Sequence, residues 1–324
     1  MRSVRRFLPA VSLLAATVAC SDKPASSPPA TDTPAGTDAA TAVTFREAAW
    51  KPLREADIPN DSMGASIKRG LYLLRFTPES LPQYATSNLR CTSCHQDDGI
   101  RPSSGPLTGS HARFPKYMPR SGTVIALADR VNYCFTRSLA GNAIPVESRE
   151  MVDILAYLAF ISKDIPVGTK IAGAEGLISM PDTLDGDVAR GQTLYTEKLC
   201  VTCHGPDGAG NGPIPPLWGP KSYSIGASMT RIERAASFIK HNMPQTAPGS
   251  LTAQEAFDLS AFINSHPRPD SPGKENDWPM GGAPADVPYD TKDHKAFRPP
   301  PAIPRANPKG ALVPNPPVIS RSKR

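Results

Sequence analysis

The sequence is poor in cysteine, and its N-terminal apolar run is too short to cross a bilayer. Only six cysteines occur in 324 residues, which is few enough to consider each one individually. The apolar run at residues 11–19 follows Arg2, Arg5 and Arg6, a pattern typical of a secretory signal peptide. We therefore expect the chain to be exported.

The signal region ends in a candidate lipid attachment site. The segment "ATVAC" places small residues before Cys20, as in bacterial lipoproteins, although Thr17 replaces the usual Leu or Val. We expect residues 1–20 to be a signal peptide of the lipoprotein type and the protein to be periplasmic, anchored to a membrane through a lipid on Cys20. An ordinary secretory signal cleaved near Ala19 is the alternative.

Strong charge of one sign is also absent. The net charge of +6 is mild and is partly carried by the chain ends, so it does not indicate nucleic-acid binding. Residues 21–43 are rich in Ser, Thr, Ala and Pro and are expected to form a flexible linker. About 280 residues then remain, which is enough for two small domains with extensions.

Four cysteines lie in two C-x-x-C-H motifs. They are Cys91 and Cys94, followed by His95, and Cys200 and Cys203, followed by His204. This motif is the attachment signature of c-type haem, in which two thiols bond to the porphyrin and the histidine binds the iron. Two copies in one exported chain disfavour a zinc site, a thioredoxin-like redox pair or chance. We expect two covalently bound haem c groups.

The two motifs belong to an internal repeat. Each follows a segment with helical spacing of apolar residues, and each precedes a helix of the pattern Glu-x-x-Asp-aliphatic-x-Ala-aromatic-aliphatic. We expect the early glycine of each repeat, Gly70 or Gly191, to let the late aromatic, Tyr157 or Phe262, pack against bare backbone. This layout resembles the class I cytochrome c fold, so we expect a mostly α-helical protein with two tandem domains of that fold.

The repeat sets the expected domain boundaries. We expect cytochrome c domains at residues 44–165 and 187–267, an interdomain linker at 166–186 and an extended Pro-rich tail at 268–324. The chain from Pro267 onward holds 14 of the 37 prolines, a composition that also fits full disorder. Because Trp278, Tyr289 and Phe297 recur there, we expect a belt across both domains with these aromatics as anchors and a loose end after Pro304.

Each haem iron needs a sixth ligand from the segment between its motif and the closing helix. In the second domain, Met243 is followed by proline, the usual setting of the distal methionine in this fold. Met/His ligation raises the reduction potential. Lys240, His241 and Met229 are competing candidates in the same region.

The first domain has no methionine at the equivalent place. Met118 is the nearest alternative, and Leu139 cannot bind a metal. The segment does contain Cys134, whose thiolate could bind the iron as a soft anionic ligand and lower the potential of the first haem. A buried free cysteine that acts as a small hydrophobe fits the composition equally well.

Longer segments resemble the thiosulfate dehydrogenase family of dihaem c-type cytochromes, from about residue 60 to the tail. The matching segments are "LPQYATSNLRCTSCH", "FPKYMPRSGTVIALADRVNYCFTRS" and "EMVDILAYLAFIS" in the first domain, and "LWGPKSYSIGASM", "AASFIKHNMP" and "SAFINSHPRP" in the second. One departure is "RSLAG" at residues 137–141, where the family more often has "RSMNG". It affects the fit of the substrate more than the chemistry.

The resemblance implies a function and a set of site residues. Members of the family oxidise two thiosulfates to tetrathionate or run the reverse reaction, and they pass electrons to an external acceptor such as another cytochrome c. By resemblance, Cys134 is the distal ligand of a catalytic first haem and a catalytic residue, and Arg120 and Arg130 are active-site arginines. Asn242 and Met243 match the distal region of the second haem, which transfers electrons.

Elementary chemistry is consistent with these roles. Two thiosulfate dianions repel each other, and arginine provides permanent positive charge with forked donors suited to sulfonate oxygens. Arg130 precedes Cys134 by one helical turn and would lower the pKa of its thiol. The arginines could instead neutralise haem propionates in a dihaem electron carrier without substrate chemistry, or in an electron-donor subunit of an oxidase.

Overall fold

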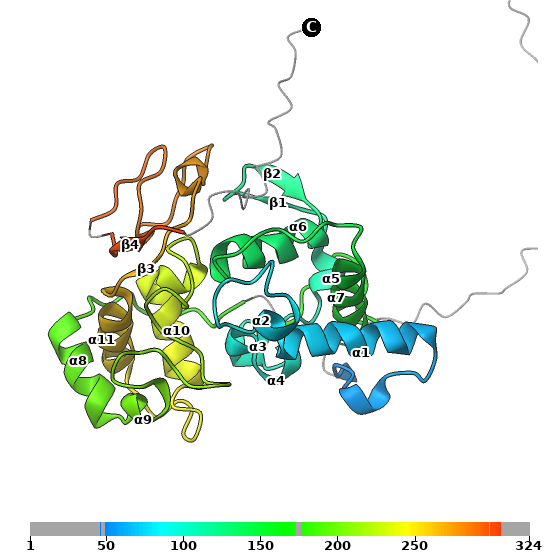
Figure 1. The fold of residues 1–324 in the computed structure, drawn as a ribbon, viewed down its shortest axis with the longest axis horizontal. Coiled ribbons are helices and arrows are strands. Elements are labelled where there is room, and N and C mark those ends of the chain that lie inside the picture. Colours follow the sequence, from blue (N-terminus) through cyan, green and yellow to red (C-terminus); the bar gives the residue numbers. More distant parts are fainter. Residues whose placement is uncertain (1–45, 47–48, 173–175, 298, 306–324) are drawn as a thin grey trace, which may run out of the picture. The chain divides into compact units, whose positions relative to one another are not determined.

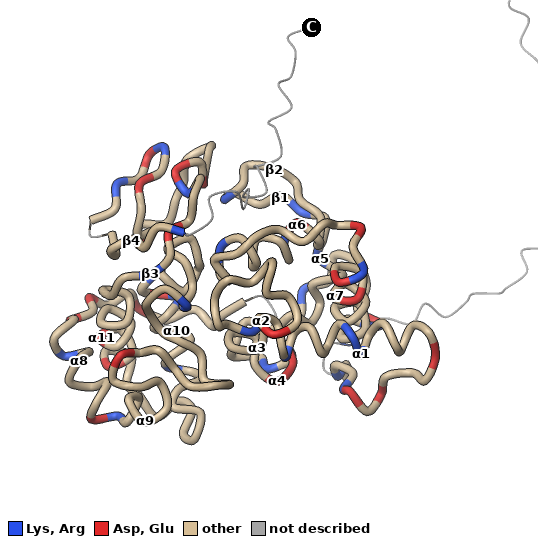
Figure 2. Tube along the Cα trace, in the orientation of Figure 1, with Lys and Arg blue, Asp and Glu red and all other residues tan. Residues whose placement is uncertain are grey.

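The computed structural model describes residues 46, 49–172, 176–297 and 299–305. The expected signal peptide, Cys20, the linker at 21–43 and the end of the tail beyond residue 305 lie outside the described residues. Within the described ranges, no helix combines the length and the apolar character that a membrane crossing requires. Figure 2 shows Lys and Arg interspersed with Asp and Glu along the described chain.

The first domain of the repeat, here called the first module, runs from Glu55 to Phe160 and consists of helices and one short hairpin (Figure 1). Its helices are α1 (Ser62–Arg75), α2 (Thr77–Ser80), α3 (Cys91–Cys94), α4 (Gln96–Gly99), α5 (Ser110–Arg113), α6 (Leu127–Tyr133) and α7 (Arg149–Phe160). Strands β1 (Lys116–Met118) and β2 (Thr123–Ile125) form an antiparallel hairpin before α6. Short 3₁₀ turns occur at Glu55–Asp57 and Pro102–Ser104, and a π-helical turn, Cys134–Ser138, continues α6.

The second module repeats the helical frame with fewer elements. Its helices are α8 (Val188–Glu197), α9 (Cys200–His204), α10 (Ile232–Asn242) and α11 (Ala253–Asn264), with a 3₁₀ turn at Ser228–Thr230. In α1 the backbone N–H of Gly64 donates to the Asp61 carboxylate over 2.7 Å, and in α8 that of Arg190 donates to Asp187 over 2.8 Å. Both first helices therefore begin at an aspartate that caps the N-terminus.

The first and last helices of each module cross at a glycine, as predicted from the sequence. A Cβ at Gly70 would lie 2.0 Å from the Asp153 carbonyl oxygen, and a Cβ at Gly191 would lie 2.0 Å from that of Asp258. The late aromatics are also close, since the same Cβ atoms would lie 2.9 Å from Tyr157 Cβ and 2.7 Å from Phe262 Cβ respectively. Only glycine allows α1 to approach α7, and α8 to approach α11, this closely.

Each crossing also carries an ion pair that the sequence analysis did not identify. Arg69 Nε donates to Asp153 Oδ2 over 2.8 Å, and Arg190 Nε donates to Asp258 Oδ2 over 3.0 Å. In both modules the arginine directly precedes the crossing glycine and the aspartate lies in the closing helix. The repeat therefore extends to a buried carboxylate that links the two helices.

Each module has its own hydrophobic core. The first is built around residues such as Leu74, Phe135, Met151 and Tyr157, and the second around residues such as Tyr195, Trp218, Phe257 and Phe262. Two residues of the second sequence repeat, Tyr223 and Ala227, pack in the first core.

The described part of the tail is ordered by a small cluster of its own. Strand β3 (Arg268–Pro269) pairs in parallel with β4 (Ala302–Ile303), and Trp278 and Tyr289 pack with Val287 and Ile225. The burial of Trp278 and Tyr289 agrees with their predicted role as anchors. The same prediction is wrong for Phe297, which is 91% exposed; it lies in the proline-rich return to β4, outside this cluster.

Candidate active site and haem sites

The histidines of both C-x-x-C-H motifs are oriented by backbone carbonyl groups. His95 Nδ1 contacts the carbonyl oxygen of Gly105, and His204 Nδ1 lies 3.0 Å from that of Pro215. A carbonyl can only accept, so Nδ1 carries a proton and Nε2 is the nitrogen left to face an iron. This is the arrangement found for metal-binding histidines, and the motif residues fit a c-type haem in both modules.

Among the described residues, the motif cysteines form no disulfides. Cys91, Cys94 and Cys200 are partly buried and Cys203 is exposed. Burial raises the pKa of Cys91 to about 11 and that of Cys94 to about 12. Before any covalent bond forms, these two thiols are therefore neutral at physiological pH.

Cys134 lies close to Cys91 and Cys94 but in a different electrostatic environment. Arg130 Nη1 donates to Cys134 Sγ over 3.1 Å, and the His95 imidazole lies within hydrogen-bonding reach of the same sulfur. Since His95 Nδ1 is held by Gly105, the nitrogen that faces Cys134 is Nε2. The two side chains expected to bind the first iron therefore point toward one another.

This environment favours the anionic form of the Cys134 thiol. Burial alone would raise the pKa of Cys134, but the charge of Arg130 and the contact with His95 outweigh it and lower the pKa to about 6. The thiolate is the nucleophilic and metal-binding form of cysteine. Of the three neighbouring thiols in the first module, Cys134 is thus the one that is charged at neutral pH.

The local sequence accounts for the placement of Arg130 and Cys134. Asp129 caps α6 by accepting from the backbone N–H of Ala126 over 2.9 Å, and Arg130 lies one turn before the cysteine, as the spacing predicts. The chain then widens into the π-helical turn Cys134–Ser138. Such turns interrupt a regular helix and frequently occur at functional sites.

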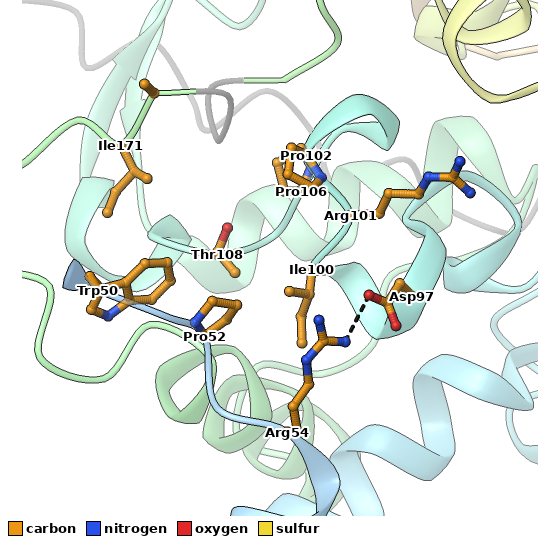
Figure 3. Close-up of a pocket in the computed structure, with 11 residues that line it drawn as sticks. Trp50, Pro52, Arg54, Asp97, Ile100, Arg101, Pro102, Pro106, Thr108 and Ile171 are labelled. Atoms are coloured by element: carbon orange, nitrogen blue, oxygen red, sulfur yellow. Dashed lines mark hydrogen bonds and ion pairs between the residues drawn. The ribbon is translucent and has the colours of Figure 1, made fainter. Parts of the chain in front are cut away.

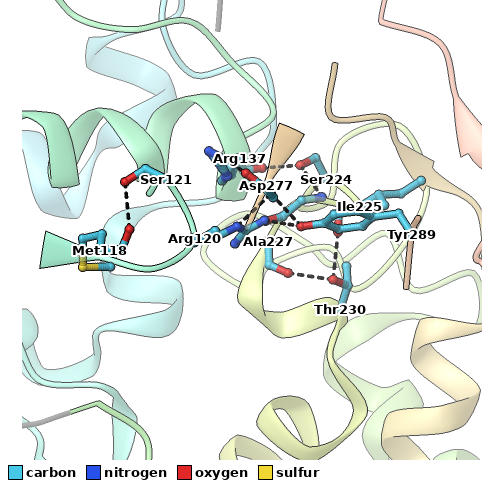
Figure 4. A network of polar contacts seen from close by, with 11 residues as sticks. Met118, Arg120, Ser121, Arg137, Ser224, Ile225, Ala227, Thr230, Asp277 and Tyr289 are labelled. Atoms are coloured by element: carbon cyan, nitrogen blue, oxygen red, sulfur yellow. Dashed lines mark hydrogen bonds and ion pairs between the residues drawn. The ribbon is translucent and has the colours of Figure 1, made fainter. Parts of the chain in front are cut away.

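Arg120 makes its contacts in a different place. Its Nε donates to Asp277 Oδ2 over 2.9 Å and its Nη2 donates to the Gly226 carbonyl over 2.6 Å, while its guanidinium lies 5.1 Å from the Trp278 ring centroid. The structure therefore brings Arg130 to Cys134. It joins Arg120 instead to the tail and the second module (Figure 4). No contact between Arg120 and Cys134 occurs among the described residues.

Arg137, in the turn that begins at Cys134, and its partner Asp277 are residues that sequence reasoning missed. Arg137 follows Cys134 by three residues, and its Nη2 donates to the fully buried carboxylate of Asp277. The Tyr289 hydroxyl donates to the same carboxylate over 2.8 Å. The only sequence signal was the recurrence of aromatics in the tail, since an aspartate 140 residues from its arginine forms no local pattern.

In the second module, the competing ligand candidates lie in distinct surroundings. Met243 packs against the second core, whereas Met229 packs against the first. Lys240 Nζ donates to the carbonyl of Gly249 over 2.9 Å and also to that of Leu251, and His241 is partly buried at the end of α10. These positions favour Met243 over Met229 and Lys240.

Asn242, the neighbour of Met243, contacts the first module. Its side chain is fully buried, its Nδ2 donates to the Ser103 carbonyl over 2.9 Å, and its Oδ1 accepts from Ser103 Oγ over 2.8 Å. Ser103 lies two residues before Gly105, whose carbonyl orients His95. A short polar connection therefore joins the residue before Met243 to the turn that leads to the Gly105 carbonyl.

A surface cavity of about 380 Å³ lies outside these sites. Trp50, Ile100 and Ile171 are among its lining residues, and Arg54 Nη1 and Asp97 Oδ2 form an ion pair of 2.7 Å at its wall (Figure 3). None of the expected ligands or active-site arginines lines it, so it is not the candidate active site.

The fold and the two oriented C-x-x-C-H histidines define a c-type cytochrome built from two cytochrome c domains. The family model described as "SoxA/TsdA, cytochrome c domain" matches residues 83–167, and the cytochrome c model matches residues 188–267. The expectation of two tandem cytochrome c domains is thereby confirmed.

Curated relatives identify the family. The thiosulfate dehydrogenase of Psychrobacter arcticus is 38% identical over 239 residues, covering 72% of this chain and 72% of the relative. That of Allochromatium vinosum is 39% identical over 222 residues, covering 65% of this chain and 82% of the relative. The chain belongs to the thiosulfate dehydrogenase family and is an oxidoreductase.

A solved structure is also similar. The thiosulfate dehydrogenase (TsdBA) from Marichromatium purpuratum, in its "as isolated" form, has a TM-score of 0.65 and 30% sequence identity to this chain. The similarity covers 69% of this chain and 50% of the solved one. The matched region therefore spans about half of the solved chain.

Proposed function

We propose that this protein is a dihaem cytochrome c that oxidises two thiosulfates to tetrathionate, or catalyses the reverse reaction. The observation that carries the proposal is the position of Cys134, whose sulfur faces the His95 imidazole and lies 3.1 Å from Arg130 Nη1. A carrier without substrate chemistry needs an iron ligand here, but it does not need a cation that holds the thiol in its reactive form.

The proposed ligand set follows from the two modules. Cys91 and Cys94 would hold one haem c, with His95 and Cys134 as axial ligands, and Cys200 and Cys203 would hold the other, with His204 and Met243. When bound, the two haems supply acceptors for one electron each. The soft thiolate favours a low potential at the first site and methionine a higher potential at the second, so electrons would leave through the second.

The sulfur chemistry requires a nucleophile and positive charge. The terminal sulfur of one thiosulfate bonds to Cys134 Sγ with loss of two electrons. The sulfur of a second thiosulfate then attacks the adduct at the sulfur derived from the first, releasing tetrathionate and restoring the thiolate. Arg130 supports both steps, because its charge offsets the repulsion between dianions and lowers the pKa of the leaving thiol.

Arg120 is proposed to contribute charge to the same site by resemblance to the family. Its present partners are Asp277, Gly226 and Tyr289, so any direct contact with substrate would require its guanidinium to exchange one of them. We also propose that the protein works in the periplasm, anchored through a lipid on Cys20, with another cytochrome c as its external electron acceptor.

Purified holoprotein should reduce ferricyanide with thiosulfate, and Cys134→Ala should abolish this turnover while a pyridine haemochrome assay still finds two haems per chain. Cys134→Met restores an iron ligand but no nucleophile, so it should raise the first potential and remain inactive. A Cys134→Ala variant that oxidises thiosulfate at the normal rate, or an inactive wild-type holoprotein, would leave the dihaem carrier as the better account.

A further inference from the structure

Residues from two separate segments of the tail make polar contacts with the turn that carries Cys134 and with the residues just after it. Asp277 accepts from Arg137 Nη2, and Arg305 donates to the carbonyls of Thr136 over 2.7 Å and Gly141 over 3.2 Å. These contacts fall within seven residues after the thiol. The backbone and the side chains that follow Cys134 are therefore held by residues more than 130 positions further along the chain.

Asp277 is the centre of this arrangement (Figure 4). Its carboxylate is 0% exposed and receives Arg120 Nε, Arg137 Nη2 and the Tyr289 hydroxyl. Two buried guanidinium groups thus share one carboxylate, and the cluster keeps a net positive charge. Without the carboxylate, two like charges would be buried side by side, which is strongly unfavourable.

Arg137 transmits this contact to the thiol region. Its guanidinium lies 4.7 Å from the ring centroid of Tyr133, the residue before Cys134, and its carbonyl accepts from Ser224 Oγ of the second module. Arg137 is therefore fixed on one side by the residue that precedes the thiol and on the other by the tail and the second module. A displacement of Arg137 would displace the π-helical turn that begins at Cys134.

We infer that Asp277 is a positioning residue for the active site. It holds Arg137 and Arg120 together and thereby fixes the turn that presents Cys134. The inference rests on the role of Cys134 proposed above. It makes the Pro-rich tail a part of the active site, in addition to its packing role.

The test compares Asp277→Asn with Asp286→Asn in the holoprotein. Asp286 is the matched control, because it is also a tail carboxylate paired with an arginine, Arg231, over 2.6 Å, but at the start of α10 in the second module. Asp277→Asn should change the spectrum and potential of the first haem, leave those of the second unchanged, and raise the KM for thiosulfate about tenfold. Asp286→Asn should leave the first haem and the KM as in the wild type.

A second variant covers the case in which Asp277→Asn does not fold. Tyr289→Phe removes one hydrogen bond from the carboxylate but keeps its charge, so it should cause a smaller shift at the same haem. A purely structural role would lower thermal stability in Asp277→Asn without shifting the first haem selectively, and that result would overturn the inference. An Asp277→Asn variant in which the spectrum and potential of the first haem and the KM for thiosulfate are all unchanged would overturn it as well. If Cys134→Ala is inactive while Asp277→Asn resembles the wild type, only this inference fails and the proposed function stands.

Discussion

The two modules share a frame and differ most between the C-x-x-C-H motif and the closing helix. In both, a glycine crossing joins the first and last helices, an arginine beside that glycine pairs with an aspartate, and a carbonyl orients the motif histidine. Between motif and closing helix, the first module has a hairpin, α6 and a π-helical turn, whereas the second has α10. In the proposed assignment, the shared parts would hold the cofactor, and the variable segment would supply the side chain that determines the chemistry of each site.

Substitutions at the crossing glycines, Gly70 and Gly191, test the helix frame that the two modules share. Gly70→Ala would place a Cβ 2.0 Å from the Asp153 carbonyl, so the two helices would have to separate. We expect a loss of about 3 kcal/mol or more in the free energy of unfolding, measured by guanidinium denaturation together with haem content. Gly191→Ala should cost a similar amount, and Lys68→Ala on the exposed side of α1 is the control. A small cost for either glycine variant would contradict the equivalence of the two crossings.

A substitution at Met243 tests the proposed difference in distal ligand between the two haem sites. Met243→Leu keeps the apolar contact with the second core but removes the sulfur, so the second haem should lose its high potential while the first keeps its spectrum and potential. Redox titration followed at both haems measures this. Simultaneous changes at both haems, or at neither, would show that Met243 is not the distal ligand of the second site alone.

Of the substitutions at the crossing glycines, Met243 and Arg130, removal of the charge of Arg130 beside Cys134 should have the smallest effect. Arg130→Ala removes a cation that lowers the thiol pKa to about 6, so the pKa should rise and the thiolate should form only at higher pH. The acidic limb of the pH–activity profile should therefore move to higher pH, and the KM for thiosulfate should increase severalfold. Arg130→Lys should restore part of both effects. If the acidic limb of the profile does not move in Arg130→Ala, then Arg130 does not control the ionisation of the thiol.

Features with a local or repeated pattern were predictable from the sequence. The C-x-x-C-H motifs, the crossing glycines and the spacing of Arg130 and Cys134 depend on residues within one helix or on comparison of two repeats. The fold class followed from the same patterns. The contact between Arg130 and the thiol followed because four residues make one helical turn.

Long-range polar contacts could not be predicted in this way. Arg120 and Asp277 are 157 residues apart, and Ser103 and Asn242 are 139 apart. Such pairs depend on how the modules and the tail pack, and a single sequence contains no periodic signal for them. The prediction for Phe297 was wrong for a related reason, since an aromatic residue in a Pro-rich segment is equally compatible with a buried and an exposed position.

The position of Asp277 has a consequence for the order in which the protein matures. Translation delivers the N-terminal part of a chain first, so under the proposed export both haem-attachment motifs and the residues of both cores would arrive before residue 277 does. Until then, Arg120 and Arg137 lack the carboxylate that they share in the finished protein. If Asp277 positions the active site as we infer, the site nearest the start of the chain is the last to be completed, and a product truncated before residue 277 would carry every proposed haem-binding residue and still lack that carboxylate.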